Sequence, residues 1–334
     1  MASTAATVSL KQKPENEEGE AQGQWSVVAR RFRRHRMAMI SLVVLMIILL
    51  MSFLAPYITP YARDTIDVTA PVRPAPPGVV TDAGRHLLGI DHLGRDLFTR
   101  LLYAGRISLT IAIFVVAISE TLGVMIGAAA GYFGGFTDAA VSRVIEFMLA
   151  IPLLPILLIV SAILLKGDDI LRPPEFLNRI IGAVLLTPAR ETRQVVVMIM
   201  ILVVFSWLGA ARLMRGMALS LRSREFVEAL RAQGASEGRI IFRHIIPNGI
   251  APILVNASLA LGGIIILESA LSFLGVGIQD PTPTWGNMLA QSRSYMFTNP
   301  WLPLVPGIPL VIVSLCFNFI GDGLRDALDP RLKR

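Results

Sequence analysis

Long apolar runs divide the chain into segments of the length that crosses a lipid bilayer. A helix rising about 1.5 Å per residue needs roughly 20 such residues to cross a hydrocarbon core about 30 Å thick. The pattern therefore predicts an all-α polytopic membrane protein with six transmembrane helices, the first of them an N-terminal anchor. The six predicted spans are residues 37–58, 107–136, 147–165, 195–211, 249–277 and 301–321.

The composition supports a membrane location. Hydrophobic residues make up 54% of the 334 residues and charged residues only 16%, a balance typical of proteins that live in lipid. Pro152 and Pro155 fall inside the third run, and we expect neighbouring helices to accommodate them within one span.

The distribution of basic residues predicts the orientation. Arginines cluster at residues 30–36, ahead of the first run, and seven more lie between Arg212 and Arg243, in the loop that joins the fourth and fifth runs. Positive charge in short loops is retained on the cytoplasmic side. Both termini and this loop are therefore predicted to face the cytoplasm, and the segments at 60–77 and 166–194 to face the other side.

Catalytic and cofactor signals are weak. The chain has no GxxxxGK[ST] phosphate loop. Its four histidines, His35, His86, His92 and His244, lie beside no candidate serine or cysteine nucleophile, so we predict neither an enzyme nor a cofactor site. Cys316 is the single cysteine, which excludes an internal disulfide. His86 and His92 are six residues apart and share no helix face, so no metal site is predicted. The DHLGRD segment at residues 91–96, which contains His92, is interpreted as a structured outer turn in which Arg95 and Asp96 could pair locally.

A charged stretch of 25 residues, 224–248, interrupts the apolar pattern. Ser223 is the expected N-cap of a short helix with one apolar face, and Gly234 supplies the left-handed residue that ends it. Ser236 is expected to cap a second helical segment over residues 237–246, after which Pro247 sets the entry to the fifth span. The apolar face is predicted to carry Phe226, Ala229, Leu230 and Gln233.

The same stretch, read as E-A-x-x-x-x-G with a proline 13 residues after the glycine, resembles the cytoplasmic EAA loop of the permease subunits of bacterial ABC importers. Further segments are similar to the dipeptide and oligopeptide subfamily, specifically its second, C-type subunit. The family's second alanine is Leu230 here, and its I-x-L-P ending appears as H-I-I-P. The supporting segments are residues 86–109, 131–138, 271–289 and 321–334.

The resemblance implies a type I ABC importer permease that moves di- or oligopeptides across the bacterial cytoplasmic membrane. Its domains would be a disordered tail over 1–24, an anchor helix with an extracytoplasmic segment over 25–102, the permease domain over 103–326 and a basic tail over 327–334. The implied partners are a homologous second permease, two cytoplasmic ATPase subunits that hold ATP and Mg, an extracytoplasmic solute-binding protein and membrane lipid, with no nucleic acid.

The resemblance also implies that the EAA loop forms a coupling helix that docks on an ATPase. The residues expected to couple are Phe226, Glu228, Ala229, Leu230, Gly234 and Pro247. An alternative interpretation is a solvated loop whose arginines only set topology and contact lipid headgroups. For five of them this simpler role fits individually: Arg212, Arg215, Arg222, Arg239 and Arg243.

Two acidic residues lie inside predicted spans, where a charge is costly and usually has a partner or faces a cavity. Glu268, with Ser269, is predicted to line the translocation pathway or the subunit interface, the alternative being a carboxylate that reaches lipid headgroups. Glu120 is predicted to be structural, either protonated or hydrogen-bonded. A rival class is a proton-coupled secondary transporter that uses Glu120 and Glu268. Nickel, haem or another peptide-like solute are alternative cargoes within the same family.

Overall fold

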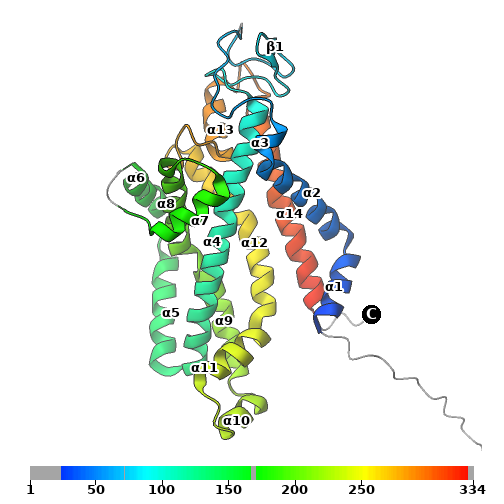
Figure 1. The fold of residues 1–334 in the computed structure, drawn as a ribbon. Helices are drawn as coiled ribbons and strands as arrows, with labels where there is room; N and C mark the ends of the chain where they lie inside the picture. The colour runs from blue at the N-terminus through cyan, green and yellow to red at the C-terminus, as the bar shows by residue number, and fades with distance from the viewer. Residues whose placement is uncertain (1–23, 71, 167–170, 330–334) are drawn as a thin grey trace, which may run out of the picture.

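The structure, a computed structural model, describes residues 24–70, 72–166 and 171–329. It is an elongated bundle of helices (Figure 1), in agreement with the predicted fold class. In the described part, five helical segments are long and apolar enough to cross a membrane, and a sharply bent pair makes up to six. The five are Arg36–Phe53, Leu97–Phe133, Ala189–Leu221, Glu237–Phe273 and Leu304–Leu328. The tail predicted over 1–24 lies almost entirely outside the described residues.

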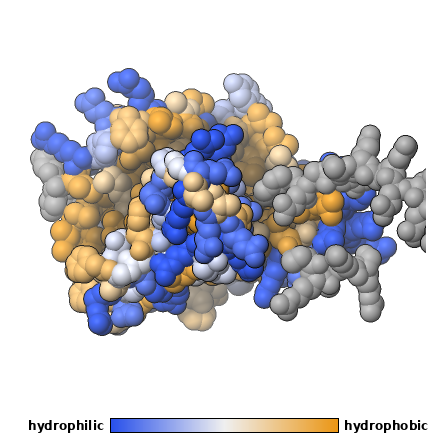
Figure 2. Space-filling model, turned by 90° about the horizontal axis from the view of Figure 1, so that it is seen from below, coloured by the Kyte–Doolittle hydropathy of each residue, from blue (hydrophilic) through white to orange (hydrophobic). Residues whose placement is uncertain are grey.

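We call the two ends of the bundle the cap end and the loop end. The cap end carries the small hairpin of β1 (Val80–Thr81) and β2 (Gly84–Arg85), and the loop end carries α10 (Glu225–Ala232). Seen from the loop end, hydrophilic side chains gather across the middle of the molecule and hydrophobic ones flank them (Figure 2). The remaining elements are α1 (Gln24–Arg34), α2 (Arg36–Phe53), α3 (Ala55–Ile58), α4 (Leu97–Phe133), α5 (Gly135–Ala150), α6 (Leu153–Lys166), α7 (Glu175–Leu185), α8 (Ala189–Ser206), α9 (Leu208–Leu221), α11 (Glu237–Ile240), η1 (Ile241–Ile245), α12 (Ile246–Phe273), α13 (Trp285–Ser292), η2 (Arg293–Tyr295) and α14 (Leu304–Leu328).

Helix α4 runs through the centre of the bundle and is longer than the hydrocarbon core of a bilayer is thick. Its 37 residues span about 55 Å at 1.5 Å per residue. It begins ten residues before the predicted run, because the Asp96 carboxylate caps it by accepting from the Thr99 backbone N–H at 2.7 Å. The boundary predicted after residue 102 therefore falls inside α4.

A row of glycines brings α4 into close contact with α9. Gly123, Gly127 and Gly131 recur every four residues, so they lie on one face of the helix. A Cβ on each would stand 2.3–2.5 Å from a backbone carbonyl oxygen of α9, namely those of Trp207, Ala211 and Arg215. Small residues at this spacing allow two membrane helices to approach backbone to backbone. We call this contact the glycine seam.

The third predicted span is not a single helix. Helices α5 and α6 meet at an angle of 85° across Ile151 and Pro152. Pro152 lies at the break and cannot donate a helical hydrogen bond. A proline also pushes the residue before it out of the helical region. Ile151 accordingly has an extended conformation, with ψ of 129°. The proline is therefore accommodated at a sharp bend rather than within a straight helix, and α5 with α6 forms either one broken span or a re-entrant pair.

The outer loop predicted over 166–194 is also more structured than expected, since it contains α7 and the start of α8. The Arg106 guanidinium of α4 donates two hydrogen bonds, at 2.6 and 3.1 Å, to the Val184 carbonyl near the C-terminus of α7. Positive charge at a helix C-terminus complements the helix dipole. This buried arginine therefore docks α7 against α4.

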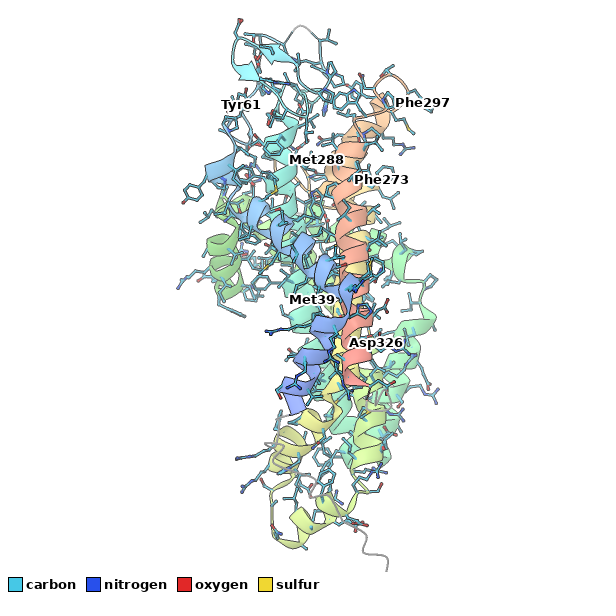
Figure 3. All side chains as sticks on the ribbon, turned by 90° about the vertical axis from the view of Figure 1, so that its right-hand side faces the viewer. Met39, Tyr61, Phe273, Met288, Phe297 and Asp326 are labelled. Carbon is cyan, nitrogen blue, oxygen red and sulfur yellow. The ribbon has the colours of Figure 1, made fainter. Side chains whose placement is uncertain are left out.

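Helices α1 and α2 pack along α14, as Figure 3 shows for the ends that carry Met39 and Asp326. A Cβ on Gly323 would clash with the Ala38 side chain at 2.4 Å, so the glycine permits this approach. His35 caps α2 through its Nδ1 and lies 3.6 Å from the Asp326 carboxylate. The anchor helix is thus part of the bundle in this chain.

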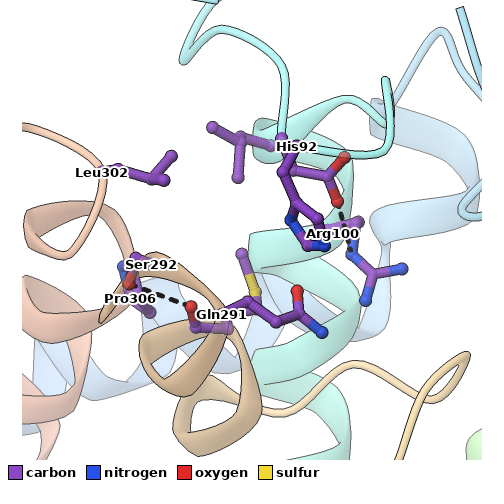
Figure 4. A pocket seen from close by; sticks show the side chains of 9 residues that line it. His92, Arg100, Gln291, Ser292, Leu302 and Pro306 are labelled. Atoms are coloured by element: carbon purple, nitrogen blue, oxygen red, sulfur yellow. Dashed lines mark hydrogen bonds and ion pairs between the residues drawn. The ribbon is translucent and has the colours of Figure 1, made fainter. Parts of the chain in front are cut away.

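A network of buried charges fastens the cap end. The Arg100 side chain of α4 is 1% exposed and donates to Asp280 at 2.9 Å and to Asp64 at 3.3 Å. Arg95 pairs with Asp91 at 2.7 Å. Beside this network, under the turn that holds His92 (Figure 4), is a cavity of about 10 Å³, room for no more than a water molecule. The network ties the segment before α4 to the loop before α13.

The expected pair of Arg95 with Asp96 does not form. The Asp96 carboxylate instead holds the ring of His86 at 2.8 Å, and the other ring nitrogen lies 3.2 Å from Asp67. Tyr61 stacks on the same imidazole with ring centroids 4.5 Å apart. His86 is therefore a buried residue that connects Asp67, Asp96 and Tyr61 at the cap end. Among the described residues, no group of three or more His, Cys, Asp or Glu is placed to hold a metal ion.

The Asp67 carboxylate makes the cap end sensitive to acid. A hydrogen bond from the Thr69 hydroxyl above all holds the pKa of Asp67 below its ordinary value of 3.8. A carboxylate with a lowered pKa stabilises the folded state above that ordinary value and loses the contribution as the pH falls below it. We expect the thermal midpoint of the wild type to fall between pH 5 and pH 3 more steeply than that of Asp67→Asn. The exposed Asp82→Asn is the control, and equal slopes for the wild type and Asp67→Asn would contradict the assignment.

Candidate functional site

The charged loop folds into a short helix, α10, at the tip of the loop end. It begins at Glu225 with Arg224 as its N-cap, not at the predicted Ser223, and no side chain caps it. Glu225 and Glu228 lie in its first turn and Arg231 in its last, each complementary to the helix dipole. The predicted helix of two to three turns is therefore present, with its start shifted by one residue.

Helix α10 has an inward and an outward face. Val227 is fully buried and Leu230 half-buried, while Phe226 is 39% exposed and Ala229 and Glu228 are exposed. The predicted single apolar face is thus divided: Leu230 and the unpredicted Val227 pack inward, and Phe226 and Ala229 are left free. A partner arriving at this end meets an aromatic side chain beside an acidic one.

The inward face of α10 belongs to a small core, which we call the loop core. It joins the loop to the ends of α4, α9 and α12 through apolar contacts and is separate from the main core of the bundle. The loop therefore has a defined position without any partner. The buried members of the loop core are Val124, Ala128, Tyr132, Met214, Ala218, Val227, Ile240, Ile241, Ile245 and Ile253.

Gly234 ends α10 as predicted. It has a φ of +77°, which glycine adopts without the steric cost that a side chain adds. The Gly234 N–H bonds to the Arg231 carbonyl and the Ala235 N–H to the Leu230 carbonyl, at 2.9 and 3.0 Å. This is the Schellman arrangement, in which a residue after the helix packs on the last turn. Leu230 and Ala235 both pack against the loop core.

Pro247 does not separate two helices. Residues Glu237–Phe273 form one continuous helical segment, and the turn before Pro247 widens into the π-helical η1, in which the Ile246 N–H bonds to Ile241, five residues back. A proline has no N–H for the usual bond, and a wider turn accommodates it. Ser236 is the N-cap of this segment, without a side-chain hydrogen bond.

Polar contacts fasten the end of α9 and the loop to the ends of α4 and α5. Arg215 binds Asp138 of α5 through two hydrogen bonds, and the Arg222 guanidinium lies 3.4 Å from the Gly131 carbonyl. The Arg231 guanidinium lies 5.1 Å from the centroid of the Tyr132 ring, and its Nε donates to the Tyr132 hydroxyl at 3.3 Å. This hydrogen bond is the main reason why the pKa of Arg231 is raised. Arg215 and Arg222, predicted as topology determinants, thus also have specific partners.

Glu268 lies far from the loop, inside the bundle. It is fully buried and accepts hydrogen bonds from Ser272 at 2.8 Å and from Ser108 of α4 at 3.2 Å. The Ser108 hydroxyl also accepts from the Trp285 backbone N–H, at 3.3 Å, so the carboxylate connects α12, α4 and the start of α13. Ser269 is buried beside it, against Gly286.

Glu120 is hydrogen-bonded, as predicted. The Asn256 amide of α12 donates to its carboxylate at 2.7 Å, and the glutamate is 8% exposed. It therefore fixes α4 to α12 near the middle of both helices. Glu120 and Glu268 both join α4 to α12, but they have different partners at different levels of the two helices and do not meet in one site.

The functional residues predicted from the sequence thus fall in two places. Five of the coupling residues lie on α10 or its C-terminal turn, Pro247 lies beyond η1, and Glu268 with Ser269 lies under α13. Sequence reasoning missed Tyr132, Val227 and the glycine seam. The seam had a visible signal in the four-residue glycine spacing of residues 123–131, and Tyr132 had none.

Comparisons with known proteins agree with this architecture. Residues 123–334, more than half of the chain, match the family described as "Binding-protein-dependent transport system inner membrane component". Residues 23–77 match the "N-terminal TM domain of oligopeptide transport permease C". The chain is a multi-pass permease subunit of the inner membrane. It belongs to the family of binding-protein-dependent transport system inner membrane components.

Individual relatives are similar over nearly the whole length. The dipeptide transport system permease protein DppC of Alkalihalophilus pseudofirmus is 35% identical over 96% of this chain and 94% of its own. The oligopeptide transport system permease protein OppC of Haemophilus influenzae is 38% identical over 93% and 90%. The OppC of Mycobacterium bovis is 34% identical over 91% and 94%.

Family membership decides between the two transporter classes considered. The chain is the permease component of an ABC transport system that works with a binding protein and an ATPase, and it is not itself an enzyme. ATP is bound and hydrolysed on partner subunits, so the permease needs no cofactor. A proton-coupled carrier that uses Glu120 and Glu268 is excluded.

Proposed function

We propose that the chain moves peptides across the cytoplasmic membrane and that α10 is the helix that receives the motion of an ATPase. The observation that carries the coupling role is the exposure of Phe226, Ala229 and Glu228 on a helix that is otherwise anchored in the loop core. An exposed apolar anchor with a polar rim is the pattern of a helix that docks in a groove.

The peptide cargo is supported by the relatives, which are named as dipeptide and oligopeptide permeases. Nickel, haem and other peptide-like solutes remain alternative cargoes. Binding of labelled di- and oligopeptides to the cognate binding protein, followed by uptake into proteoliposomes, distinguishes them. Uptake of a metal or haem but of no peptide would overturn this part of the proposal.

The assembly that we propose contains a homologous second permease, two ATPase subunits and a binding protein on the opposite side. Both termini would lie in the cytoplasm with the loop end, because arginines are concentrated at residues 30–36 and in the loop that carries α10. The cap end would then face the binding protein. The domain division predicted from the sequence is retained, except that α4 crosses the boundary at 102.

We assign Glu268 and Ser269 to the support of α13 rather than to the open pathway, because both are buried within this single chain. The pathway role predicted for them is the alternative. Phe226, Glu228 and Ala229 are assigned to ATPase contact, and Leu230, Gly234 and Pro247 to the shape of the loop.

The direct test is copurification. An affinity-tagged chain expressed with its partners should retain an ATPase, and Phe226→Asp should reduce the retained ATPase by about tenfold, since a buried charge opposes docking. Phe297→Asp is the matched control, because Phe297 is 92% exposed and projects from the cap end (Figure 3). Retention that Phe226→Asp leaves unchanged would show that the ATPase does not dock on α10.

A further inference from the structure

Tyr132 occupies an unusual position, at the last turn of α4 and in contact with both helices of the loop. Its side chain lies in the loop core and the residue is only 3% exposed. The hydroxyl donates to a Glu237 carboxylate oxygen of α11 and accepts from Arg231 Nε of α10. A phenol has one donor and lone pairs to accept, so this hydroxyl makes a bond to each side of the Gly234 turn.

The surrounding contacts make the same connection through apolar surface. Val227 of α10 and Ile240 of α11 are fully buried in the loop core with the Tyr132 ring. The Arg231 guanidinium over the ring adds a cation–π contact. The two loop helices and the end of α4 therefore meet around one aromatic side chain.

The chain path shows why this contact is needed. α10 is joined through the backbone to α9 on one side and to α11 and α12 on the other. α4 has no direct backbone link to the loop, so a displacement of α10 reaches it through packing, either at the loop core around Tyr132 or through α9 at the glycine seam. Arg222 also touches the Tyr132 backbone carbonyl, at 3.5 Å, but the hydroxyl of Tyr132 holds both loop helices.

We propose that Tyr132 is the positioning residue through which movement of α10 is passed to α4. Because the glycine seam holds α9 against α4, these two helices would then move as one body. The proposal rests on the proposed function, in which α10 receives the motion of the ATPase. Loss of the hydroxyl would let α10 move without α4, so ATP would be hydrolysed with less transport.

The first experiment needs no partner. In the purified full-length chain in nanodiscs, Tyr132→Phe keeps the ring and removes both hydrogen bonds. We expect amide hydrogen exchange in α10 to increase about fivefold, the effect of losing two partly buried hydrogen bonds. Tyr57→Phe is the matched control, since Tyr57 is 88% exposed and its hydroxyl has no hydrogen bond within the described part of the chain. Unchanged exchange in α10 would overturn the proposal.

The second experiment uses the assembled transporter in proteoliposomes. Tyr132→Phe should retain the ATPase and its basal hydrolysis, while substrate moved per ATP falls about fivefold. Glu237→Leu should reproduce this loss, and Glu237→Gln, which keeps an acceptor oxygen, should restore much of the coupling. A residue that only stabilised the fold would lower transport and hydrolysis together.

The outcomes separate the two proposals. If the wild type couples hydrolysis to transport and Tyr132→Phe couples equally well, the role of Tyr132 is wrong and that of α10 stands. If Phe226→Asp leaves ATPase docking unchanged, the coupling role of α10 fails and that of Tyr132 fails with it. If the Tyr132→Phe and Glu237→Leu losses add fully in the double variant, the two residues do not act through their shared hydrogen bond.

Discussion

Replacing Gly127 by valine is expected to leave little folded permease in the membrane. Its Cβ would stand 2.3 Å from the Ala211 carbonyl oxygen, a backbone atom that cannot turn away. Even Gly127→Ala should lower the free energy of unfolding by about 1 to 3 kcal/mol, the usual cost of overpacking. Thermal unfolding in detergent and the yield of monodisperse protein measure both effects.

Gly216 of α9 provides the control, because a Cβ there meets nothing within 4 Å. Gly216→Ala should leave the thermal midpoint unchanged or raise it slightly, since alanine favours a helix over glycine. If Gly127→Ala proves as stable as Gly216→Ala, α4 and α9 do not touch as closely as the structure places them.

Two substitutions in the coupling loop, Glu228→Lys and Gly234→Asp, are expected to reduce transport at least about tenfold while insertion in the membrane stays normal. Glu228→Lys reverses a charge on the exposed rim of α10 and places a cation near the positive end of the helix. Gly234→Asp strains a residue with φ of +77° and adds an anion at the negative end. Uptake and ATP hydrolysis that depends on binding protein are the measurements.

Gly238→Asp is the matched control for the second variant, because Gly238 is exposed, its Cβ meets nothing within 4 Å and its φ is not positive. Gly234→Asn should retain more activity than Gly234→Asp, since asparagine tolerates the left-handed region and carries no charge. Full transport by both Glu228→Lys and Gly234→Asp would remove the coupling assignment.

Apolar runs predicted five of the six spans correctly as helices, because each is long enough that no soluble alternative competes with insertion. The gap between two apolar runs also located the loop that carries α10. Gly234 identified the C-terminus of α10, because ending a helix with a left-handed residue is a local requirement of the backbone that favours glycine. The element limits were less accurate. α4 begins ten residues early because capping and buried charge pairs extend it beyond the apolar part.

The side-chain partners could not be predicted, because they depend on which residues the fold brings together, and local sequence patterns do not show this. Asp96 stands next to Arg95 in the sequence and yet binds His86, while Arg95 turns to Asp91. The buried residue at the start of α10 was predicted to be Phe226 and is Val227, for a similar reason. The ends of α4, α9 and α12 determine which face of α10 packs inward, and Val227 lies on that face. The Tyr132 hydroxyl bridges residues about a hundred positions away.

The break between α5 and α6 has a consequence for hydration. The last carbonyls of α5 have no following helical turn to donate to them, and residues 152–155 are exposed in this chain. Hydrocarbon tails offer such groups no hydrogen bonds, so irregular backbone at this depth survives only against protein or a wetted space. At the corner around Ile151 we therefore expect water or a neighbouring subunit, rather than lipid, to complete the surface.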